Sequence, residues 1–369
     1  MEYHESDVLK AGNNIYGYSN IQDRRNKRFV ERKTKYKMRV AINGMGRIGR
    51  LLFRRLVNHS HIEMVAVNDI MDPHNLAYLL QYDSVYGKFE LPVWFNGKLM
   101  IEDRAVHCFS ELDPLKLPWK ELAVDVVLEC TGKFTSKQGA SKHLNAGAKK
   151  VLLSTTGSED VPLMIYGHNQ QPLTNEIDII SPGGCMTNCS THLIYLVNSI
   201  GIDSLHINVI HSYTSRQELV DAPHNDFRRG RAAAESIIPV PVDLGISLER
   251  LFPPLKNKIA TTTTRVPVAN GALADFTFQL KEEVTKEQIN TLFREAALNE
   301  YKGIIEYTQE PIVSLDIKSN KHSAIVDGSL TSVVGQQVKV FAFFDNEYGY
   351  TSRIVDWLNF WGKFVEVDS

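Results

Sequence analysis

The sequence has little of several things that mark specialised classes of protein. Its 369 residues include only 4 cysteines, too few for a disulfide framework, so we expect a reducing, cytoplasmic environment in which one reactive thiol can persist. No apolar run approaches the roughly 20 residues that cross a bilayer. The formal net charge of -2 gives no overall attraction to nucleic acid or to an anionic membrane, and we expect neither as a partner. The remaining composition is that of an ordinary globular protein, long enough for two domains.

Residues 1–37 stand apart because they are polar, rich in Arg and Lys, and interspersed with acidic residues. A secretory signal needs an apolar stretch that is missing here, and organellar transit peptides avoid acidic residues. We interpret the segment as a disordered tail, with an arm for nucleic acid or another partner as the alternative. Met38 is the first residue of the first predicted strand, so an incorrectly assigned gene start would also account for residues 1–37.

Hydrophobic patterning divides the rest of the chain into two parts. In the first part, a helix predicted at 47–58 lies among buried strands predicted at 38–43, 64–68, 125–130 and 150–154. Such alternation predicts a parallel sheet with helices on both faces. After about residue 184, a helix is predicted at 352–364, and long alternating strands at 207–214, 260–268, 274–280 and 338–344. Long strands with few helices between them predict a mainly antiparallel sheet, and hence an α+β domain.

A glycine-rich turn joins the first predicted strand to the first helix. Gly44, Gly46 and Gly49 have the spacing G-x-G-x-x-G, which allows a tight turn, approach of backbone amides to a pyrophosphate, and close packing of helix on strand. The helix N-terminus adds unpaired N–H groups and a positive partial charge. Asp69 ends the next strand, where a carboxylate accepts from a ribose 2′-hydroxyl and repels a 2′-phosphate. The segment predicts a dinucleotide site that prefers NAD to NADP; for Asp69, a helix cap or a solvated loop acid is the alternative.

Cys185 is the candidate nucleophile. It follows two glycines, which leave space for a substrate, and if a helix begins near Thr187 the helix N-terminus lowers the pKa of the thiol. His211, in a strand with apolar neighbours, is the candidate base. The alternatives are a buried structural cysteine and a satisfied core histidine, both of which are common. We interpret the other cysteines as structural (Cys108, Cys130 and Cys189), and the spacing of His and Cys predicts no metal site.

Seven strings of residues, in this order, make the chain similar to the glyceraldehyde-3-phosphate dehydrogenase superfamily, which includes an erythrose-4-phosphate dehydrogenase branch. They lie at 41–50 (AINGMGRIGR), 67–69 (VND), 130–132 (CTG), 185–189 (CMTNC), 211–214 (HSYT), 265–267 (RVP) and 345–350 (DNEYGY). The resemblance covers about residues 38–365. It implies a Rossmann NAD-binding domain at 38–184, a catalytic domain at 185–351, and a C-terminal helix at 352–369 that packs back on the Rossmann domain.

The resemblance also implies a role for each matching residue, with Cys185 as nucleophile and His211 as base. The implied cofactor contacts are Gly44, Gly46, Arg47, Ile48, Gly49, Asp69, Thr131, Gly132, Asn346 and Tyr350. Among them, Thr131 and Gly132 line the nicotinamide side, and Asn346 orients the nicotinamide amide. The implied phosphate contacts of the substrate are Thr214, Arg216 and Arg265, where Arg216 replaces a usual threonine and adds a cation. Members that use NAD have a proline at the position of Pro223, and the family implies a homotetramer in which residues 212–237 form an inter-subunit loop.

The chain departs from the family pattern around the thiol. Two flanking hydroxyls are replaced by Gly184 and Met186, and a hydroxyl and a glycine farther on are replaced by Val242 and Asp243. Each lost hydrogen bond to a charged group is worth roughly 1–3 kcal/mol, so three losses weaken binding of inorganic phosphate by about three orders of magnitude or more. Residues 226–234 and 242–244 are more similar to the erythrose-4-phosphate branch, in which water resolves the thioester.

The predicted activity is NAD-dependent oxidation of a short phosphorylated sugar aldehyde, of the glyceraldehyde-3-phosphate dehydrogenase type. The thiolate attacks the aldehyde, the imidazole removes the hemithioacetal proton, hydride passes to NAD, and phosphate or water then releases the acyl group from the thioester. Two alternatives stay open. One is a non-phosphorylating erythrose-4-phosphate dehydrogenase-like enzyme in which water acts, and the other is a non-enzymatic NAD-binding interaction protein. The preferred aldose and the direction of flux have no signature in the sequence.

Overall fold

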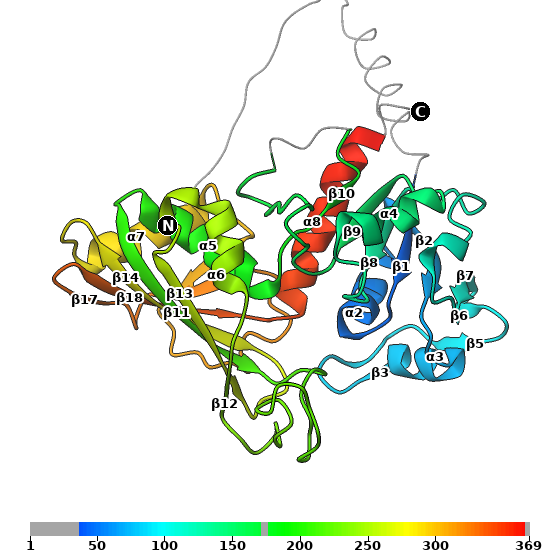
Figure 1. The fold of residues 1–369 in the computed structure, drawn as a ribbon, viewed down its shortest axis with the longest axis horizontal. Coiled ribbons are helices and arrows are strands. Elements are labelled where there is room, and N and C mark those ends of the chain that lie inside the picture. Colours follow the sequence, from blue (N-terminus) through cyan, green and yellow to red (C-terminus); the bar gives the residue numbers. More distant parts are fainter. Residues whose placement is uncertain (1–36, 171–175, 366–369) are drawn as a thin grey trace, which may run out of the picture. The chain divides into compact units, whose positions relative to one another are not determined.

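Two eight-stranded sheets form the framework of the protein (Figure 1). The computed structural model describes residues 37–170 and 176–365. The interpretations of residues 1–37 as a tail, an arm or a misassigned start therefore lie outside the described residues, apart from Lys37. Within these ranges, none of the helices is long and apolar enough to cross a membrane.

The first sheet is parallel across most of its width, with strand order β10-β9-β8-β1-β2-β7-β6-β5. Its strands are β1 (Met38–Asn43), β2 (Ile62–Asn68), β5 (Val93–Phe95), β6 (Leu99–Ile101), β7 (Arg104–Phe109), β8 (Val126–Glu129), β9 (Lys150–Leu153) and β10 (Ile179–Ile180). The accompanying helices are α2 (Arg47–Leu56), α3 (Pro73–Gln81) and α4 (Lys137–Asn145), with a short hairpin of β3 (Tyr82–Asp83) and β4 (Gly87–Lys88) and a 3-10 turn, η1 (Pro114–Lys116). Among the described strands of this sheet, the β5–β6 and β6–β7 pairs are antiparallel, and the other pairs are parallel. The predicted α/β nucleotide-binding sheet is confirmed.

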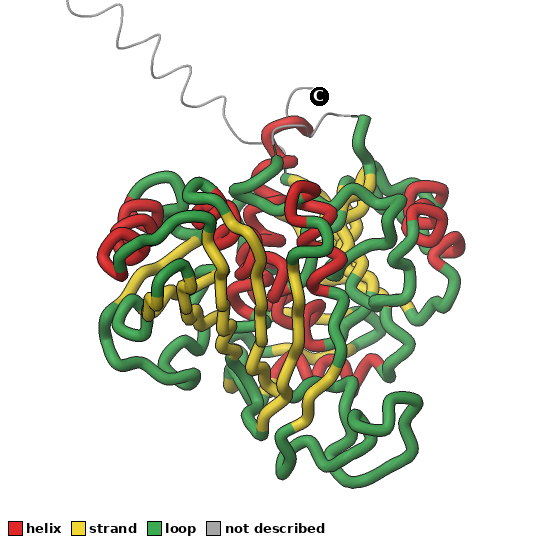
Figure 2. Tube along the Cα trace, turned by 60° about the vertical axis from the view of Figure 1, so that its left-hand side comes forward, coloured by secondary structure: helices red, strands yellow, loops and turns green. Residues whose placement is uncertain are grey.

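The second sheet has the order β12-β13-β11-β14-β18-β16-β15, with β17 paired to β18. Its strands are β11 (Ile202–Ser212), β12 (Ile238–Val240), β13 (Ile259–Val266), β14 (Ala272–Leu280), β15 (Ile305–Thr308), β16 (Ala324–Asp327), β17 (Ser332–Val334) and β18 (Gln337–Phe344). Most pairs are antiparallel, as predicted, but β11–β13 and β15–β16 are parallel. The long strands run side by side (Figure 2). In β14, buried and half-buried residues alternate strictly, so one face of the sheet meets the core.

Helices complete both halves. The helices of the second half are α5 (Cys185–Asn198), α6 (Leu244–Leu251) and α7 (Lys286–Leu298), with a 3-10 turn, η2 (Pro253–Leu255). The last helix, α8 (Tyr348–Val365), buries Ile354, Trp357 and Trp361 in one core with the residues of β1 and α2. The C-terminal helix thus returns to the first sheet, as the resemblance implies. The domain boundaries themselves stay a prediction.

The helix α8 begins at Tyr348, four residues before the predicted start. The side chain of Asp345 explains the earlier start, because its Oδ1 accepts from the backbone N–H groups of Glu347 and Tyr348 at 3.0 and 2.8 Å. These N–H groups belong to the first turn and have no partner inside the helix. A carboxylate at this position therefore caps the helix.

Candidate active site

The predicted dinucleotide turn connects β1 to α2, and its three glycines have different surroundings. Gly44 has a φ of +96°, and a Cβ there would lie 2.6 Å from the backbone nitrogen of Thr131. A Cβ at Gly49 would lie 2.1 Å from the carbonyl oxygen of Gly44. A Cβ at Gly46, the residue directly before α2, would meet nothing within 4 Å, so the space beside this residue is open. The turn thus leaves room for a ligand at the N-terminus of a helix.

A cavity of 270 Å³ adjoins this turn, lined by Asn43, Gly46, Asp69, Thr131 and Phe134 among others. Asp69 is held in place by two backbone N–H groups, of Met45 at 2.6 Å and Met71 at 2.9 Å. Each carboxylate oxygen keeps a second lone pair for a ribose hydroxyl. An open cradle of glycines beside a fixed carboxylate therefore fits NAD, and the negative charge disfavours a 2′-phosphate.

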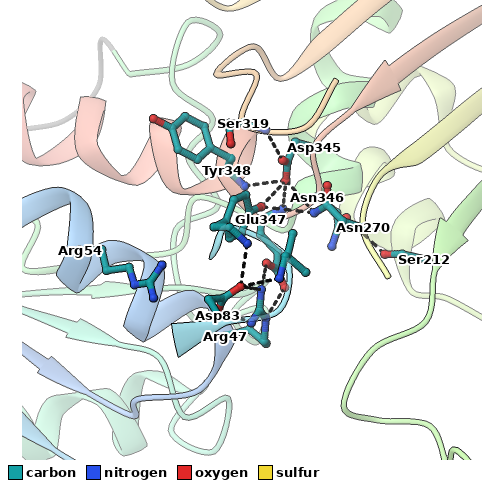
Figure 3. A network of polar contacts seen from close by, with 12 residues as sticks. Arg47, Arg54, Asp83, Ser212, Asn270, Ser319, Asp345, Asn346, Glu347 and Tyr348 are labelled. Atoms are coloured by element: carbon teal, nitrogen blue, oxygen red, sulfur yellow. Dashed lines mark hydrogen bonds and ion pairs between the residues drawn. The ribbon is translucent and has the colours of Figure 1, made fainter. Parts of the chain in front are cut away.

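Arg47, a predicted cofactor contact, directs its side chain elsewhere. Its guanidinium binds Glu347 through Nε at 2.8 Å and Nη2 at 2.6 Å, and it also pairs with Asp83 (Figure 3). Burial opposes the charge, but the two carboxylates outweigh it and raise the pKa of Arg47. Any contact of this residue with a pyrophosphate therefore runs through its backbone N–H. Ile48 packs against the core of the first half.

Asn346 and Tyr350 lie where the second half of the chain meets the first. The Oδ1 atom of Asn346 accepts from the N–H of Gly271 at 2.9 Å and from the hydroxyl of Ser212 at 3.3 Å. This fixes the amide group and leaves its NH₂ group to donate to a ligand. The hydroxyl of Tyr350 is buried and donates to the carbonyl oxygen of Gly183 at 2.8 Å, two residues before the thiol.

Cys185 and His211 come together although 26 residues separate them. Cys185 is the first residue of α5, and His211 is the last but one of β11; Sγ lies 3.7 Å from Nε2. The thiol-bearing residue is half-buried, whereas the imidazole is buried. A thiol facing a ring nitrogen at the start of a helix is the arrangement expected of an activated nucleophile.

Both groups have shifted pKa values. Burial raises the pKa of the Cys185 thiol to about 11, while the charge of Arg265 and the backbone amides of Cys185 and Met186 act in the opposite direction. Burial, together with the charge of Arg265, lowers the pKa of His211 to about 3. The prediction of a lowered thiol pKa is therefore wrong. The helix amides act as expected, but removal of the sulfur from water has the larger effect. Near neutral pH the pair consists of a thiol and a neutral imidazole.

Arg265 lies behind the imidazole, on β13 opposite His211 in the paired strands. Its Nη1 is 2.5 Å from Nδ1 of His211 and donates to the carbonyl oxygen of Ser212 at 3.1 Å. Its Nε is buried without a hydrogen-bond partner, and no carboxylate of the described residues forms an ion pair with it. Burial lowers the pKa of Arg265 to about 10. An unpaired buried guanidinium is a place where an anion is stabilised.

The other two predicted phosphate contacts lie in the loop after β11. The hydroxyl of Thr214 accepts from the N–H of Arg216 at 3.4 Å. Arg216 is exposed, and its Nη2 lies 3.4 Å from the point where a Cβ on Gly132 would be. Its charge and that of Arg229 both act on Arg265. The loop therefore brings a second cation to the nicotinamide side of the predicted cofactor site.

The residues that replace hydroxyls near the thiol pack as apolar groups. The sulfur of Met186 accepts from the hydroxyl of Thr263 at 3.7 Å, and both Met186 and Val242 pack against the core of the second half. Asp243 precedes α6, is exposed, and makes no side-chain cap. This side of the thiol therefore offers an anion fewer donors than the family pattern implies.

Sequence reasoning missed the buried polar residues beneath the cofactor turn, above all Glu129 and His143. The available signal was a charged residue near the end of an apolar strand, two residues before the predicted Thr131–Gly132 turn, since a buried charge needs partners. Within residues 37–170 and 176–365, no group of three or more His, Cys, Asp or Glu side chains is placed to hold a metal.

Comparison with known proteins gives consistent matches along the chain. Residues 38–137 match the family model described as glyceraldehyde 3-phosphate dehydrogenase, NAD binding domain, and residues 184–346 match the C-terminal domain of the same family. Glyceraldehyde-3-phosphate dehydrogenase 1 of Bacillus subtilis (strain 168) is 42% identical over 323 residues, which are 86% of this chain and 96% of the relative. The enzyme of Borreliella burgdorferi is 42% identical over 329 residues (86% and 98%), and that of Geobacillus stearothermophilus 41% over 323 residues (86% and 96%).

Proposed function

The chain belongs to the glyceraldehyde-3-phosphate dehydrogenase family, and we propose that it oxidises the aldehyde of a short phosphorylated sugar with NAD as hydride acceptor. The observation that carries this proposal is the pair formed by the Cys185 sulfur and the His211 imidazole, 3.7 Å apart at the start of α5. The NAD-binding domain match and the open glycine turn support the cofactor.

The fit to NAD rests on three features of this chain. The turn at Gly44, Gly46 and Gly49 offers backbone N–H groups to a pyrophosphate, Asp69 offers its carboxylate to a ribose, and Asn346 offers its amide to the nicotinamide. NAD, when bound, supplies the acceptor for hydride. Every other step falls to residues of the protein.

Covalent addition uses the thiol and the imidazole. As Sγ forms its bond to the aldehyde carbon, the thiol proton passes to Nε2 of His211 and on to the aldehyde oxygen, which gives a neutral hemithioacetal. Loss of hydride from that carbon, with transfer of the hydroxyl proton to Nε2, leaves an acyl-thioester on Cys185 and a protonated imidazole. The backbone N–H of Cys185 and the ring of His211 stabilise the developing oxyanion.

The tautomer of His211 links substrate binding to this step. Nδ1 lies near a donor, Nη1 of Arg265 at 2.5 Å, and an acceptor, the carbonyl oxygen of Ser212 at 2.8 Å, and it can serve only one of them. When Arg265 binds the substrate phosphate, Nδ1–H is left to donate to Ser212. The lone pair then lies on Nε2 and faces the sulfur. Thr214 and Arg216 complete the phosphate site.

The names of the relatives favour glyceraldehyde-3-phosphate over erythrose-4-phosphate as substrate. Phosphate is then the acceptor of the acyl group, although Met186 and Val242 offer it few donors. The test is NADH absorbance with each of the two aldehydes, with and without phosphate. We expect the larger kcat/KM with glyceraldehyde-3-phosphate and turnover that rises with phosphate. A preference for erythrose-4-phosphate that is independent of phosphate would contradict this assignment, and no NADH with either aldehyde would leave a protein that only binds NAD.

A homotetramer in the cytoplasm completes the proposal. Supporting it are four large apolar side chains in or beside the loop after β11 that are 61–88% exposed in the single chain: Leu219, Val220, Phe227 and Ile237. Exposed apolar side chains gathered in one loop are typical of an interface. Light scattering after size exclusion tests this point: we expect the mass of four chains, and a monomer would refute it.

A further inference from the structure

A buried carboxylate lies beneath the predicted cofactor turn. Glu129 ends β8, is 1% exposed, and meets hydrogen-bond donors at both of its oxygens. Its Oε2 accepts from Nδ2 of Asn43 at 2.6 Å and lies 3.0 Å from Nε2 of His143. Its Oε1 accepts from the backbone N–H of Thr131 at 2.7 Å and from the Thr131 hydroxyl. Four groups thus converge on one side chain.

On one side, Trp119 determines which ring nitrogen of His143 carries the proton. The indole N–H can only donate, and it donates to Nδ1 of His143 at 3.0 Å. The ring proton must then be on Nε2, the atom that faces Glu129, and the ring is neutral. His143 is therefore a donor to the carboxylate and has no second tautomer that keeps the Trp119 contact.

On the other side, backbone atoms of Glu111 fix the orientation of two asparagines. Asn68 accepts from the N–H of Glu111 at 2.8 Å and donates to its carbonyl oxygen at 2.9 Å. Its NH₂ group therefore also faces Oδ1 of Asn43, at 2.7 Å. This leaves the NH₂ group of Asn43 pointing at Glu129. Neither amide can turn round without losing a contact to the backbone or to its neighbour.

Three of the four groups can only donate to Glu129, and the fourth, the Thr131 hydroxyl, already accepts from the N–H of Lys133 at 3.0 Å, so a protonated carboxyl fits only if this hydroxyl turns its own proton away. These hydrogen bonds favour the carboxylate form of Glu129, and within the described ranges the only basic side chain that pairs with it is His143. The charge lies directly behind Thr131, and the peptide before Thr131 is packed against Gly44 of the cofactor turn. The cavity is lined by Asn43 and Thr131 from this same network.

We propose that Glu129 is a positioning residue whose fixed negative charge makes the cofactor site prefer oxidised over reduced NAD. The proposal rests on the NAD-binding function proposed above. The nicotinamide ring is cationic in NAD⁺ and neutral in NADH, so a buried anion behind Thr131 stabilises the oxidised form selectively. The hydrogen bonds from Thr131 also hold the Thr131–Gly132 turn in place, which affects both forms equally.

The test compares E129Q with D125N, which removes an equal charge directly before the other end of β8. Asp125 is buried, pairs with Lys149 at 2.8 Å, and accepts from the N–H of Arg39 at 2.8 Å. Titration of each purified full-length variant with NAD⁺ by calorimetry and with NADH by fluorescence gives the ratio of the two dissociation constants. We expect E129Q to raise the ratio Kd(NAD⁺)/Kd(NADH) about tenfold, as for opposite charges roughly 12 Å apart in an effective dielectric near 20, and D125N to leave it within twofold.

A second variant keeps the experiment decisive if E129Q alone does not fold. Replacing Trp119 with Phe releases Nδ1 of His143, so that in W119F/E129Q the ring can change tautomer and accept from the side-chain amide that E129Q introduces. We expect this variant to show the same shifted ratio. Equal weakening of both nucleotides, or no change, in both E129Q variants would overturn the proposal and leave Glu129 a structural residue. Failure of the wild-type protein to bind either nucleotide would instead refute the proposed function.

Discussion

The cofactor side and the substrate side of the site each contain a buried charge, but these two charges differ in how many hydrogen-bond partners they have. On the cofactor side, the carboxylate of Glu129 receives donors from Asn43, His143 and Thr131. On the substrate side, the guanidinium of Arg265 forms hydrogen bonds within the described ranges only with His211 and the carbonyl oxygen of Ser212, and its Nε has no partner there. Both side chains are more than nine-tenths buried.

The difference shows which part is formed before substrate arrives. A buried charge with a full set of partners holds its surroundings in one arrangement, whereas a buried charge without them is costly until a counter-ion binds. We infer that the protein itself completes the cofactor side, whereas the phosphate of the substrate completes the substrate side. Each prediction below changes one side and leaves the other as its reference.

The largest expected effect is on the substrate side. R265Q removes the unpaired cation, and because charged hydrogen bonds to phosphate are strong, kcat/KM for glyceraldehyde-3-phosphate should fall about 10²- to 10³-fold. With unphosphorylated glyceraldehyde the loss should be much smaller, and Kd for NAD should not change. R231Q is the matched control, since Arg231 is exposed and paired with Asp221. Equal losses with both aldehydes would mean that Arg265 does not bind the phosphate.

The free energy of unfolding should respond differently to loss of the buried charge on the two sides. E129M leaves four buried donors without an acceptor and should lower the free energy of unfolding by about 2–4 kcal/mol. R265M removes a buried charge that has no counter-ion and should leave stability unchanged or raise it by about 1 kcal/mol. Urea unfolding of both proteins provides the comparison. A clear loss of stability in R265M would contradict the view that this charge is uncompensated.

Because the imidazole of His211 is neutral in the fold, we expect the free energy of unfolding to fall in acid. The pKa of His211 is about 3 in the fold against 6.5 as its ordinary value, so between these limits the unfolded chain binds a proton that the fold does not. The contribution of His211 is therefore fully present above about pH 6.5 and is lost by about 1.4 kcal/mol per pH unit as the pH falls toward 3. Unfolding free energies at pH 4 and 7 should differ less in H211Q than in wild type; an identical pH slope would refute this assignment.

The smallest expected effect concerns the side of the thiol where phosphate would bind to attack the thioester. M186T restores a hydroxyl where Met186 now contacts Thr263 at 3.7 Å, and one added hydrogen bond to phosphate should lower the KM for phosphate about tenfold. V242T serves as an independent second position. Steady-state rates at saturating aldehyde and varied phosphate measure the effect, and a KM unchanged in both variants would show that phosphate does not bind there.

Residues close in sequence, or marked by an unusual residue type, could be assigned from the sequence. The three glycines of the turn and the run around Cys185 carry their chemistry locally, and alternating hydrophobic residues separate the two sheets. Helices α3, α4, α6 and α7 were not predicted, and the start of α8 was placed too late because capping by Asp345 depends on backbone geometry.

Contacts between distant segments could not be predicted from the sequence. Glu129, His143 and Trp119 come from a strand, a helix and a loop, so nothing in the local sequence pairs them. The wrong direction predicted for the thiol pKa has the same origin, since burial of Cys185 depends on the packing of the whole site rather than on the helix that carries it.

The central claim is that Cys185, paired with His211, carries the substrate as a thioester. The direct measurement mixes the protein with NAD and glyceraldehyde-3-phosphate in the absence of phosphate, stops the reaction in acid, and locates the acyl group by peptide mass spectrometry. We predict about one NADH per chain in the first turnover and one acyl group, on the peptide that contains Cys185, with the same result in a C189S control. NADH formed without an acylated Cys185 would contradict the account.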